Sequence, residues 1–302
     1  MRMNCLITTL AVLIISSAPT IAQEKTFSQR YATVNGQPVT RGHVELLAVE
    51  QGVKSPLSAA MKTRLIALMI DRRLITGFLD KRKVKVDRKA HRRKIELTRN
   101  RIQKIRAENP EDFIKRIVMN RRSFEKQLET LVRWNTWLEG AITDDAIVAE
   151  FKANKTKYDG TRIRASQIFI KADPGDKSAV AAAESELKKI RDRITSKAVS
   201  FEAAARAHSQ APTRQQGGDI GWLTYVGKMP TVVSAAIFNL KTGELSPPIR
   251  SPFGVHLCVV TDRKEGDLSP EDARATILRK LAEAEWTRIV ESEKTGAKIS
   301  KP

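Results

Sequence analysis

The hydrophobic pattern of this chain changes its period near residue 161, and this change restricts the fold more than any other feature. Before that point apolar residues recur at helical spacing, as in Ile66, Ile70, Leu74 and Phe78. After it the segment 162–170 alternates between apolar and polar residues, as a half-buried strand does. One regular element type cannot produce both periods. The sequence therefore predicts a helical part followed by a part that contains β-strands.

The second part predicts a compact α+β domain with the element order β-α-α-turn-α-β. Its first strand, 162–170, places Ile163, Ala165, Gln167 and Phe169 on one face. Its last strand, 253–262, is apolar on both faces, which is typical of a central strand that is covered on both sides. Helical patterns over 180–194, 201–208 and 230–240, and a turn at 217–222, lie between the two strands.

A final helix is predicted after Ser269, Pro270, Glu271 and Asp272, which combine an N-cap residue, a proline and first-turn acids. Its apolar stripe is wide and needs a partner to cover it. The fold class that we expect is therefore α+β: an all-α N-terminal module, completed by the C-terminal helix, with an inserted domain whose antiparallel or mixed sheet is surrounded by helices. The expected boundaries are 1–22, 23–160, 161–265 and 266–302.

Residues 1–22 have the layout of a cleavable secretory signal peptide, with Arg2, an apolar run and small residues up to Ala22. The apolar run is shorter than the roughly 20 residues that span a bilayer, although an uncleaved signal anchor is the alternative. We expect export to the periplasm. Cleavage would leave Cys258 as the one cysteine, and a single thiol builds neither an internal disulfide nor a zinc site.

The chain carries a formal net charge of +20, with 41% hydrophobic and 29% charged residues, which excludes both wholesale disorder and a polytopic membrane protein. The excess charge is densest from Lys81 to Arg106, which hold 13 Lys and Arg residues. A solvated helix face is one interpretation of this run, and a contact with an anionic envelope surface is the other. Export and the lack of a zinc-finger or RNA-binding signature argue against nucleic acid as a partner.

The usual catalytic motifs are absent: there is no P-loop, GxSxG, HExxH or dinucleotide fingerprint, and no metal or cofactor is expected. Two polar residues stand out instead. His256 interrupts an apolar strand, and Gln167 lies on the apolar face of the strand at 162–170. If these strands are neighbours, each side chain satisfies the other. A structural core pair and a catalytic pair explain this pattern equally well.

Several ordered motifs show where the second part resembles a known family. They are Ala165–Ile170 (ASQIFI), Phe201–Ala205 (FEAAA), Gly217–Trp222 (GGDIGW), Gly227–Met229 (GKM), Ala235–Phe238 (AAIF), Thr242–Pro248 (TGELSPP) and Ser251–His256 (SPFGVH). In this order they resemble a parvulin-type (PpiC, rotamase) peptidyl-prolyl cis-trans isomerase domain over residues 161–265. The helical part, the signal peptide and the final helix together look like exported foldases of the SurA and PrsA type.

The resemblance implies roles for individual residues. His256 corresponds to the second histidine of the family, and Gln167 stands where a first histidine is usual. The positions of the prolyl-ring pocket fall on Met229, Val233, Phe253 and Ile220. A further departure is Ala211, which stands where Cys or Asp is usual. The resemblance thus implies a cofactor-free isomerase acting on X-Pro bonds of unfolded or nascent exported proteins, including acidic or aromatic-rich ones, with weak activity. A binding-only periplasmic chaperone with a degenerate isomerase domain is the alternative.

Overall fold

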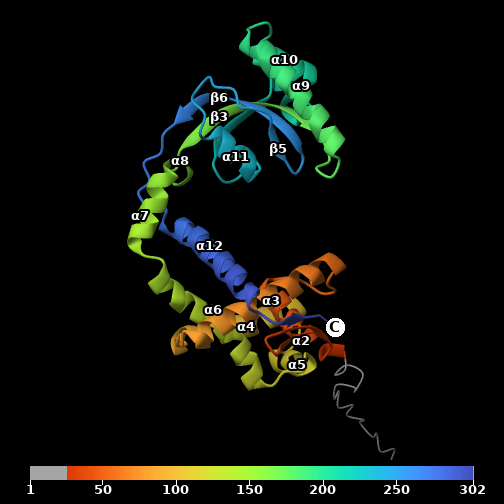
Figure 1. Cartoon of the computed structure of the whole chain (residues 1–302), viewed down its shortest axis with the longest axis vertical. Helices are drawn as coiled ribbons and strands as arrows, with labels where there is room; N and C mark the ends of the chain where they lie inside the picture. Colours follow the sequence, from red (N-terminus) through yellow and green to blue (C-terminus); the bar gives the residue numbers. More distant parts are fainter. Residues whose placement is uncertain (1–25, 302) are drawn as a thin grey trace, which may run out of the picture. The chain divides into compact units, whose positions relative to one another are not determined.

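The computed structural model describes residues 26–301, so the expected signal peptide lies outside the described residues. The contacts divide the chain into two compact units. One comprises the described residues up to Ala141 together with those from Glu283 onward, and the other comprises Ile142–Ala282. The second unit is therefore inserted into the first in sequence (Figure 1). Each unit is described by itself below.

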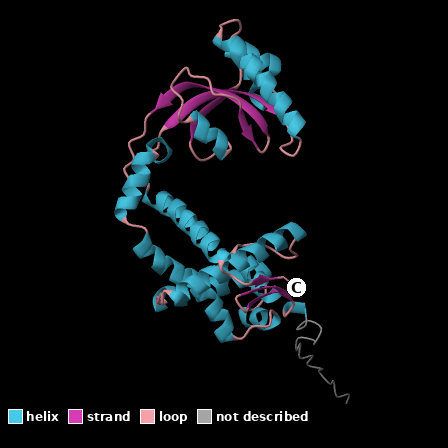
Figure 2. Ribbon diagram, in the orientation of Figure 1, coloured by secondary structure: helices cyan, strands magenta, loops and turns pink. Residues whose placement is uncertain are grey.

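The first unit is mainly helical (Figure 2). Its helices are α2 (Arg41–Glu50), α3 (Ala59–Lys81), α4 (Arg88–Arg106), α5 (Pro110–Arg116), α6 (Arg121–Ala141) and the later part of α12 (Arg274–Thr295). Side chains of Thr40, Ser58 and Asp87 accept hydrogen bonds from backbone N–H groups at the starts of α2, α3 and α4. Buried apolar residues from these helices form two clusters, so the predicted helical periodicity does produce a core.

A small antiparallel sheet adds strands to this unit, so the expectation that the N-terminal module is all-α is wrong in this detail. Its order is β2 (Gln37–Thr40), β1 (Arg30–Val34) and β7 (Ile299–Ser300). A tight turn joins β1 to β2, with Asn35 and Gly36 at positive φ angles of 49° and 80°. The pairing of β1 with β7 could not be predicted from local pattern, because it joins residues from opposite ends of the chain.

Helix α12 contributes to the cores of both units. Its residues Trp286, Ile289 and Val290 belong to the helical core of the first unit, where Trp286 meets Trp134 edge to face with ring centroids 5.1 Å apart. Its earlier residue Ile277 is buried in the second unit, in a cluster with two other helices, α7 (Asp144–Ala153) and α8 (Lys155–Tyr158). The helix begins at Arg274 rather than at Pro270, after a turn in which Ser269 and Asp272 bond reciprocally.

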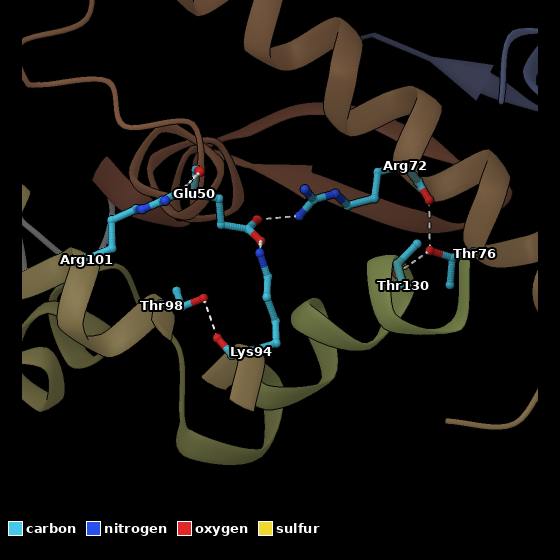
Figure 3. A network of polar contacts seen from close by, with 7 residues as sticks. All are labelled: Glu50, Arg72, Thr76, Lys94, Thr98, Arg101 and Thr130. Carbon is cyan, nitrogen blue, oxygen red and sulfur yellow. Dashed lines mark hydrogen bonds and ion pairs between the residues drawn. The ribbon is translucent and has the colours of Figure 1, made fainter. Parts of the chain in front are cut away.

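A buried carboxylate joins three helices of the first unit (Figure 3). Glu50, at the end of α2, forms an ion pair with Arg72 of α3 at 2.5 Å and with Lys94 of α4 at 3.0 Å. The guanidinium of Arg101, also on α4, donates a hydrogen bond to the backbone oxygen of Glu50. Desolvation opposes the charge of Glu50, but the two cations lower its pKa overall, so the carboxylate stays ionised.

The second unit is built on a four-stranded antiparallel sheet. Its strand order is β4 (Asp219–Thr224), β3 (Arg162–Lys171), β6 (Gly254–Lys264) and β5 (Ile249–Ser251). Both inner strands have neighbours on each side, and seven residues in the first part of β6 are at most partly exposed. The prediction that the last strand is central and covered is therefore confirmed.

The two faces of this sheet are covered by different helices. On one face, Ile168, Ile170, Val255 and Leu257 pack in a cluster with α9 (Lys177–Thr195) and α10 (Phe201–His208). On the other face, strand residues pack against α11 (Thr231–Ile237); this cluster contains Ile163, Ala165, Cys258, Val260, Val233 and Ile237. A short 3₁₀ helix, η1 (Pro212–Gln216), connects α10 to β4. The α+β class of the expected fold is confirmed.

No helix among residues 26–301 is long and apolar enough to cross a membrane.

Candidate functional site

The alternation of residues along β3 and β6 brings the two polar residues to the same face of the sheet. Residues Ile163 and Ala165 of β3 face α11, so the side chains two and four positions further, Gln167 and Phe169, share that face. On β6, His256 lies two positions before Cys258, which also faces α11. The register pairs Gln167 with Cys258 and Phe169 with His256. The predicted contact between the two strands therefore exists.

His256 is buried, with 5% of its surface exposed, and both ring nitrogens have partners. Its Nδ1 lies 3.0 Å from Oε1 of Gln167, and its Nε2 lies 2.8 Å from Oγ of Ser251. Because an amide oxygen can only accept, Nδ1 carries the proton and Nε2 is an acceptor for the Ser251 hydroxyl. The same hydroxyl lies 3.2 Å from the carbonyl oxygen of Gly254, so its single proton is shared between these two acceptors. The Phe169 ring lies beside the imidazole at a centroid distance of 4.7 Å.

Burial lowers the pKa of His256 from 6.5 to about 4. The imidazole is therefore neutral at pH 7, and the Ser251, His256 and Gln167 side chains form an uncharged hydrogen-bonded chain. No other hydrogen bond is made by the Gln167 side chain within the described residues, so its amide N–H groups remain available as donors. The site can thus offer neutral hydrogen-bond donors beside an apolar surface.

Three of the four expected pocket residues lie in the apolar cluster beside this chain. Val233 of α11 is fully buried, and Met229 and Ile220 are partly buried against the same cluster. The fourth, Phe253, is 65% exposed and precedes β6. Its backbone N–H donates to the Ser251 hydroxyl, which connects it to the hydrogen-bonded chain of His256.

Ala211 is buried next to β3, and it directly precedes η1 in the segment that connects α10 to β4. The hydroxyl oxygen of Ser209 accepts hydrogen bonds from the backbone N–H of Phe169 at 3.1 Å and of Ala211 at 3.2 Å. The N–H of Gln210 donates to the carbonyl of Phe169 at 2.7 Å. Ala211 is thus held near the Phe169 position of β3, which is paired with His256 in the sheet.

The glycine-rich turn before β4 is needed for close approach to Gln167. Gly218 has a φ angle of 84°, and a Cβ there would collide with the carbonyl oxygen of Gln167. The carbonyl of Gly218 accepts the N–H of Gln167 at 2.9 Å. Ile220 is the extra residue of a bulge between β4 and β3, because Ala165 pairs with Gly221 and Ser166 with Asp219.

Sequence reasoning missed the roles of Ser251, Phe169 and Ser209. Ser251 lies within the motif Ser251–His256, and its distance of five residues from His256 is the one signal in the sequence. A hairpin between β5 and β6 converts that spacing into contact. Ser209 gave no signal, because its partners lie 40 residues away on β3.

Cys258 is fully buried, and burial raises its thiol pKa to about 12, so it is an unreactive neutral thiol at pH 7. No cluster of three or more His, Cys, Asp or Glu residues suited to a metal ion occurs among residues 26–301. The donors of the site are therefore the amide, imidazole and hydroxyl groups described above.

Comparisons with known proteins identify the class of this domain. Residues 168–262 match the family model of the rotamase, or PPIC-type PPIase, domain. The resemblance of the second unit to parvulin-type peptidyl-prolyl isomerase domains is thereby confirmed over residues 168–262. The match lies within the second unit and does not include α7, α8 or α12.

The curated relatives are chaperones that contain a similar segment. The chain is 45% identical over 92 residues to chaperone SurA of Bordetella parapertussis, covering 30% of this chain and 18% of that protein. It is 36% identical over 139 residues to chaperone SurA of Cupriavidus metallidurans, covering 44% of this chain and 27% of that protein. The matched segment thus spans well under a third of the length of these two relatives.

A solved structure shares the fold over most of the chain. The peptidylprolyl isomerase PrsA from Bacillus cereus matches with a TM-score of 0.50 and 18% sequence identity, covering 89% of this chain and 92% of that one. At this identity the likeness concerns the fold alone. With the SurA relatives, it confirms the resemblance to SurA-type and PrsA-type foldases predicted from the sequence.

Proposed function

We propose that this protein is an exported peptidyl-prolyl isomerase and foldase, which acts in the periplasm on X-Pro bonds of unfolded or nascent exported proteins. The observation that carries the proposal is the hydrogen bond between His256 and Gln167 on the α11 face of the parvulin-type sheet. It lies beside the partly buried apolar residues Met229 and Ile220, which suit a prolyl ring. The proposed roles in catalysis are hydrogen bonding for Gln167 and His256 and ring binding for the apolar residues.

The reaction needs little chemistry from the protein. Rotation about an X-Pro bond faces a barrier of about 18–20 kcal/mol, because resonance keeps the amide planar and polar. An apolar surface removes water that stabilises the planar amide, so the twisted amide is relatively favoured. The free amide N–H groups of Gln167 can donate to the substrate while His256 holds the Gln167 oxygen. No step requires a covalent intermediate or a proton transfer.

We infer weak turnover, because two positions differ from the pattern that the resemblance implies. A glutamine amide replaces an imidazole at Gln167, and the methyl group of Ala211 offers no polar atom where Cys or Asp is usual. The polar groups on this face are therefore fewer than the resemblance implies.

A proline-isomerisation assay on the full mature chain tests the proposal. We expect His256→Ala combined with Met229→Ala to abolish most of the rate, while His208→Ala, which alters a half-buried histidine outside this face, leaves it unchanged. A rate that the double variant does not lower would refute the isomerase assignment.

A binding-only chaperone is the second candidate, and the same two departures at Gln167 and Ala211 favour it. It requires that suppression of client aggregation be independent of the isomerase site. If the double variant suppresses aggregation as well as the natural chain, and the natural chain has no measurable isomerase rate, this function replaces the first.

We also propose that α4 contacts an anionic envelope surface. Within the run Lys81 to Arg106, four residues form ion pairs with carboxylates, so part of the positive charge is neutralised inside the fold: Lys81, Lys94, Arg99 and Arg106. The nine others are exposed and make no ion pair in the described part of the chain: Arg82, Lys83, Lys85, Arg88, Lys89, Arg92, Arg93, Arg101 and Lys104. Sedimentation with anionic vesicles should show binding that weakens as salt rises, and salt-independent binding would contradict the proposal.

A further inference from the structure

The helical unit contains a pocket of about 530 Å³, which is within the range of roughly 300–1,000 Å³ typical of ligand sites. Its walls come from the segment before β1, from β1 itself, from α2, α3, α4 and α5, and from the loop before α3. Two aromatic rings, Phe27 and Tyr31, and four cationic side chains line it: Arg41, Lys62, Arg106 and Arg116. One carboxylate, Glu45, also lines it.

Two of these four cations are neutralised within the fold. Arg106 lies 3.3 Å from the carboxylate of Glu45, and Arg116 makes two hydrogen bonds to Glu108, at 2.9 and 2.7 Å. Arg41 and Lys62 have no carboxylate partner among residues 26–301. The pocket therefore has an excess positive charge of about two.

The unpaired cations lie over aromatic rings. The guanidinium carbon of Arg41 is 4.9 Å from the centroid of the Phe27 ring, and Nζ of Lys62 is 4.6 Å from the centroid of the Tyr31 ring. Such contacts orient a cation and still leave its N–H groups free to bind an anion. The same rings, together with Leu57, supply apolar surface next to the charges.

Arg106 gives an independent indication that an acceptor belongs in this pocket. Its side chain is 94% buried, since only 6% of it is exposed. One terminal nitrogen donates to the carbonyl of Val53 at 2.9 Å and the other to Glu45, but Nε has no hydrogen-bond partner. A buried donor without an acceptor is unfavourable, so a ligand oxygen that satisfied it would bind favourably.

We propose that this pocket binds carboxylate side chains of an unfolded client, in an acidic segment whose neighbouring residues are apolar. The excess charge matches one or two carboxylates, and the aromatic rings match the apolar neighbours. A peptide fits better than a lipid surface, because the site is a pocket of about 530 Å³ that a projecting side chain can enter. The inference rests on the client binding in the proposed function but is independent of the isomerase activity.

The test is a binding titration at about 0.15 M salt, where the Debye length is only about 8 Å and long-range attraction is screened. The probe is a short fluorescent peptide in which Glu alternates with Leu, and its partner probe carries Gln in place of Glu. We expect the Glu peptide to bind the full chain at least about tenfold more tightly than the Gln peptide, because hydrogen bonds to a charged group are stronger than those between neutral groups.

The variant Arg41→Gln/Lys62→Gln should lose this preference. The control Arg122→Gln/Lys126→Gln removes the same charge from exposed residues of α6, outside the pocket, and should change the affinity for the Glu peptide by less than about threefold. Equal effects of the two double variants would show a diffuse electrostatic attraction and overturn the proposal. Binding of anionic vesicles that is lost in the pocket variant, without binding of the Glu peptide, would also overturn it.

A charge reversal keeps the test independent of folding. Arg41→Glu/Lys62→Glu should bind a peptide in which Lys alternates with Leu and should no longer bind the Glu peptide, and a variant that bound neither while retaining native circular dichroism would contradict the proposal. The isomerase rate on a short X-Pro peptide serves as a separate readout. It should be unchanged in every pocket variant, so that failure of this inference and failure of the isomerase assignment can be distinguished.

Discussion

The neutral state of His256 results from burial alone, since no charged neighbour contributes to the lowering of its pKa to about 4. In the unfolded chain the same ring has its ordinary pKa of 6.5. Between these two values the unfolded state binds more protons than the folded state. The free energy of unfolding therefore falls as the pH is lowered from about 6.5 to about 4.

Replacing His256 by Gln removes this share of the pH dependence. We expect the stability difference between the natural chain and His256→Gln to shift by about 1–2 kcal/mol in favour of the variant between pH 7 and pH 4.5, as measured by urea unfolding at both values. His43, whose pKa is lowered to about 3 by burial and by Arg73, titrates in both proteins and cancels in the comparison. A difference that stays constant with pH would show that His256 does not lose its proton on folding.

Gln167 supplies the acceptor for the protonated nitrogen of His256. Gln167→Leu leaves that buried N–H without a partner, so we expect a loss of about 1–3 kcal/mol in the free energy of unfolding at pH 7. Gln215→Leu, at an exposed position on η1, is the control and should cost less than about 0.5 kcal/mol. Equal costs for the two variants in urea unfolding would argue against the hydrogen bond.

At the scale of single elements, strand alternation predicted the most about the site. The alternation placed Gln167 on the same face as Ile163, and the apolar residues on both faces around His256 predicted a central strand. The contact between Gln167 and His256 follows from this if the two strands are neighbours, as they are in the structure. The bulge at Ile220 and the contact from Ser251 could not be predicted, because they depend on register and on a hairpin rather than on local period.

Gly218 and Gly243 allow two effects of an added methyl group to be compared: backbone strain at a positive φ angle, and collision with a neighbouring atom. Gly218→Ala and Gly243→Ala both place a methyl group at a positive φ angle, 84° and 85° respectively. Only the first also drives it into the Gln167 carbonyl, whereas nothing lies within 4 Å of the second. We expect about 1 kcal/mol of destabilisation for Gly243→Ala and at least about 2–3 kcal/mol for Gly218→Ala in urea unfolding. A smaller cost at Gly218 would mean that the turn can move away from β3.

The contacts of α2 with α3 and α4 include ion pairs to the buried carboxylate of Glu50. Glu50→Gln leaves Arg72, which is buried, and Lys94 without their counter-ion, so we expect a loss of about 3–5 kcal/mol in the stability of the helical unit. Glu129→Gln, a half-buried position on α6 without an ion pair, is the matched control. Similar thermal unfolding of the two variants would show that Arg72 and Lys94 find other partners.

At the scale of the whole molecule, the sequence predicted a helical module interrupted by an α+β domain, and the chain does leave and re-enter its helical unit. The division differs in detail from the expected boundaries of 160 and 266, because residues 142–160 and the first part of α12 share a core. Apolar periodicity identifies which face of a helix is buried, but not which other element covers that face. The division of α12 between the two units could therefore not be predicted.

Single substitutions in α12 should therefore act on different units. Trp286→Ala should accelerate amide hydrogen exchange in α3 and α6, and Ile277→Ala should do so in α7 and α8, each with a loss of about 2–5 kcal/mol. The control is Glu291→Ala, at an exposed position of the same helix, which should leave amide hydrogen exchange in all four helices unchanged. Faster exchange in all four helices after either substitution would show that the two cores open together.

Cys258 has a practical consequence for measurements of this kind. It is the one cysteine among the described residues, it lies at the centre of the sheet, and its thiol is both buried and protonated. A thiol reagent can modify it only when strands β3 and β6 and the cover provided by α11 separate. The natural chain thus contains its own chemical reporter of opening at the α11 face of the sheet, and the labelling rate with and without a proline-containing peptide would measure whether that peptide closes this face.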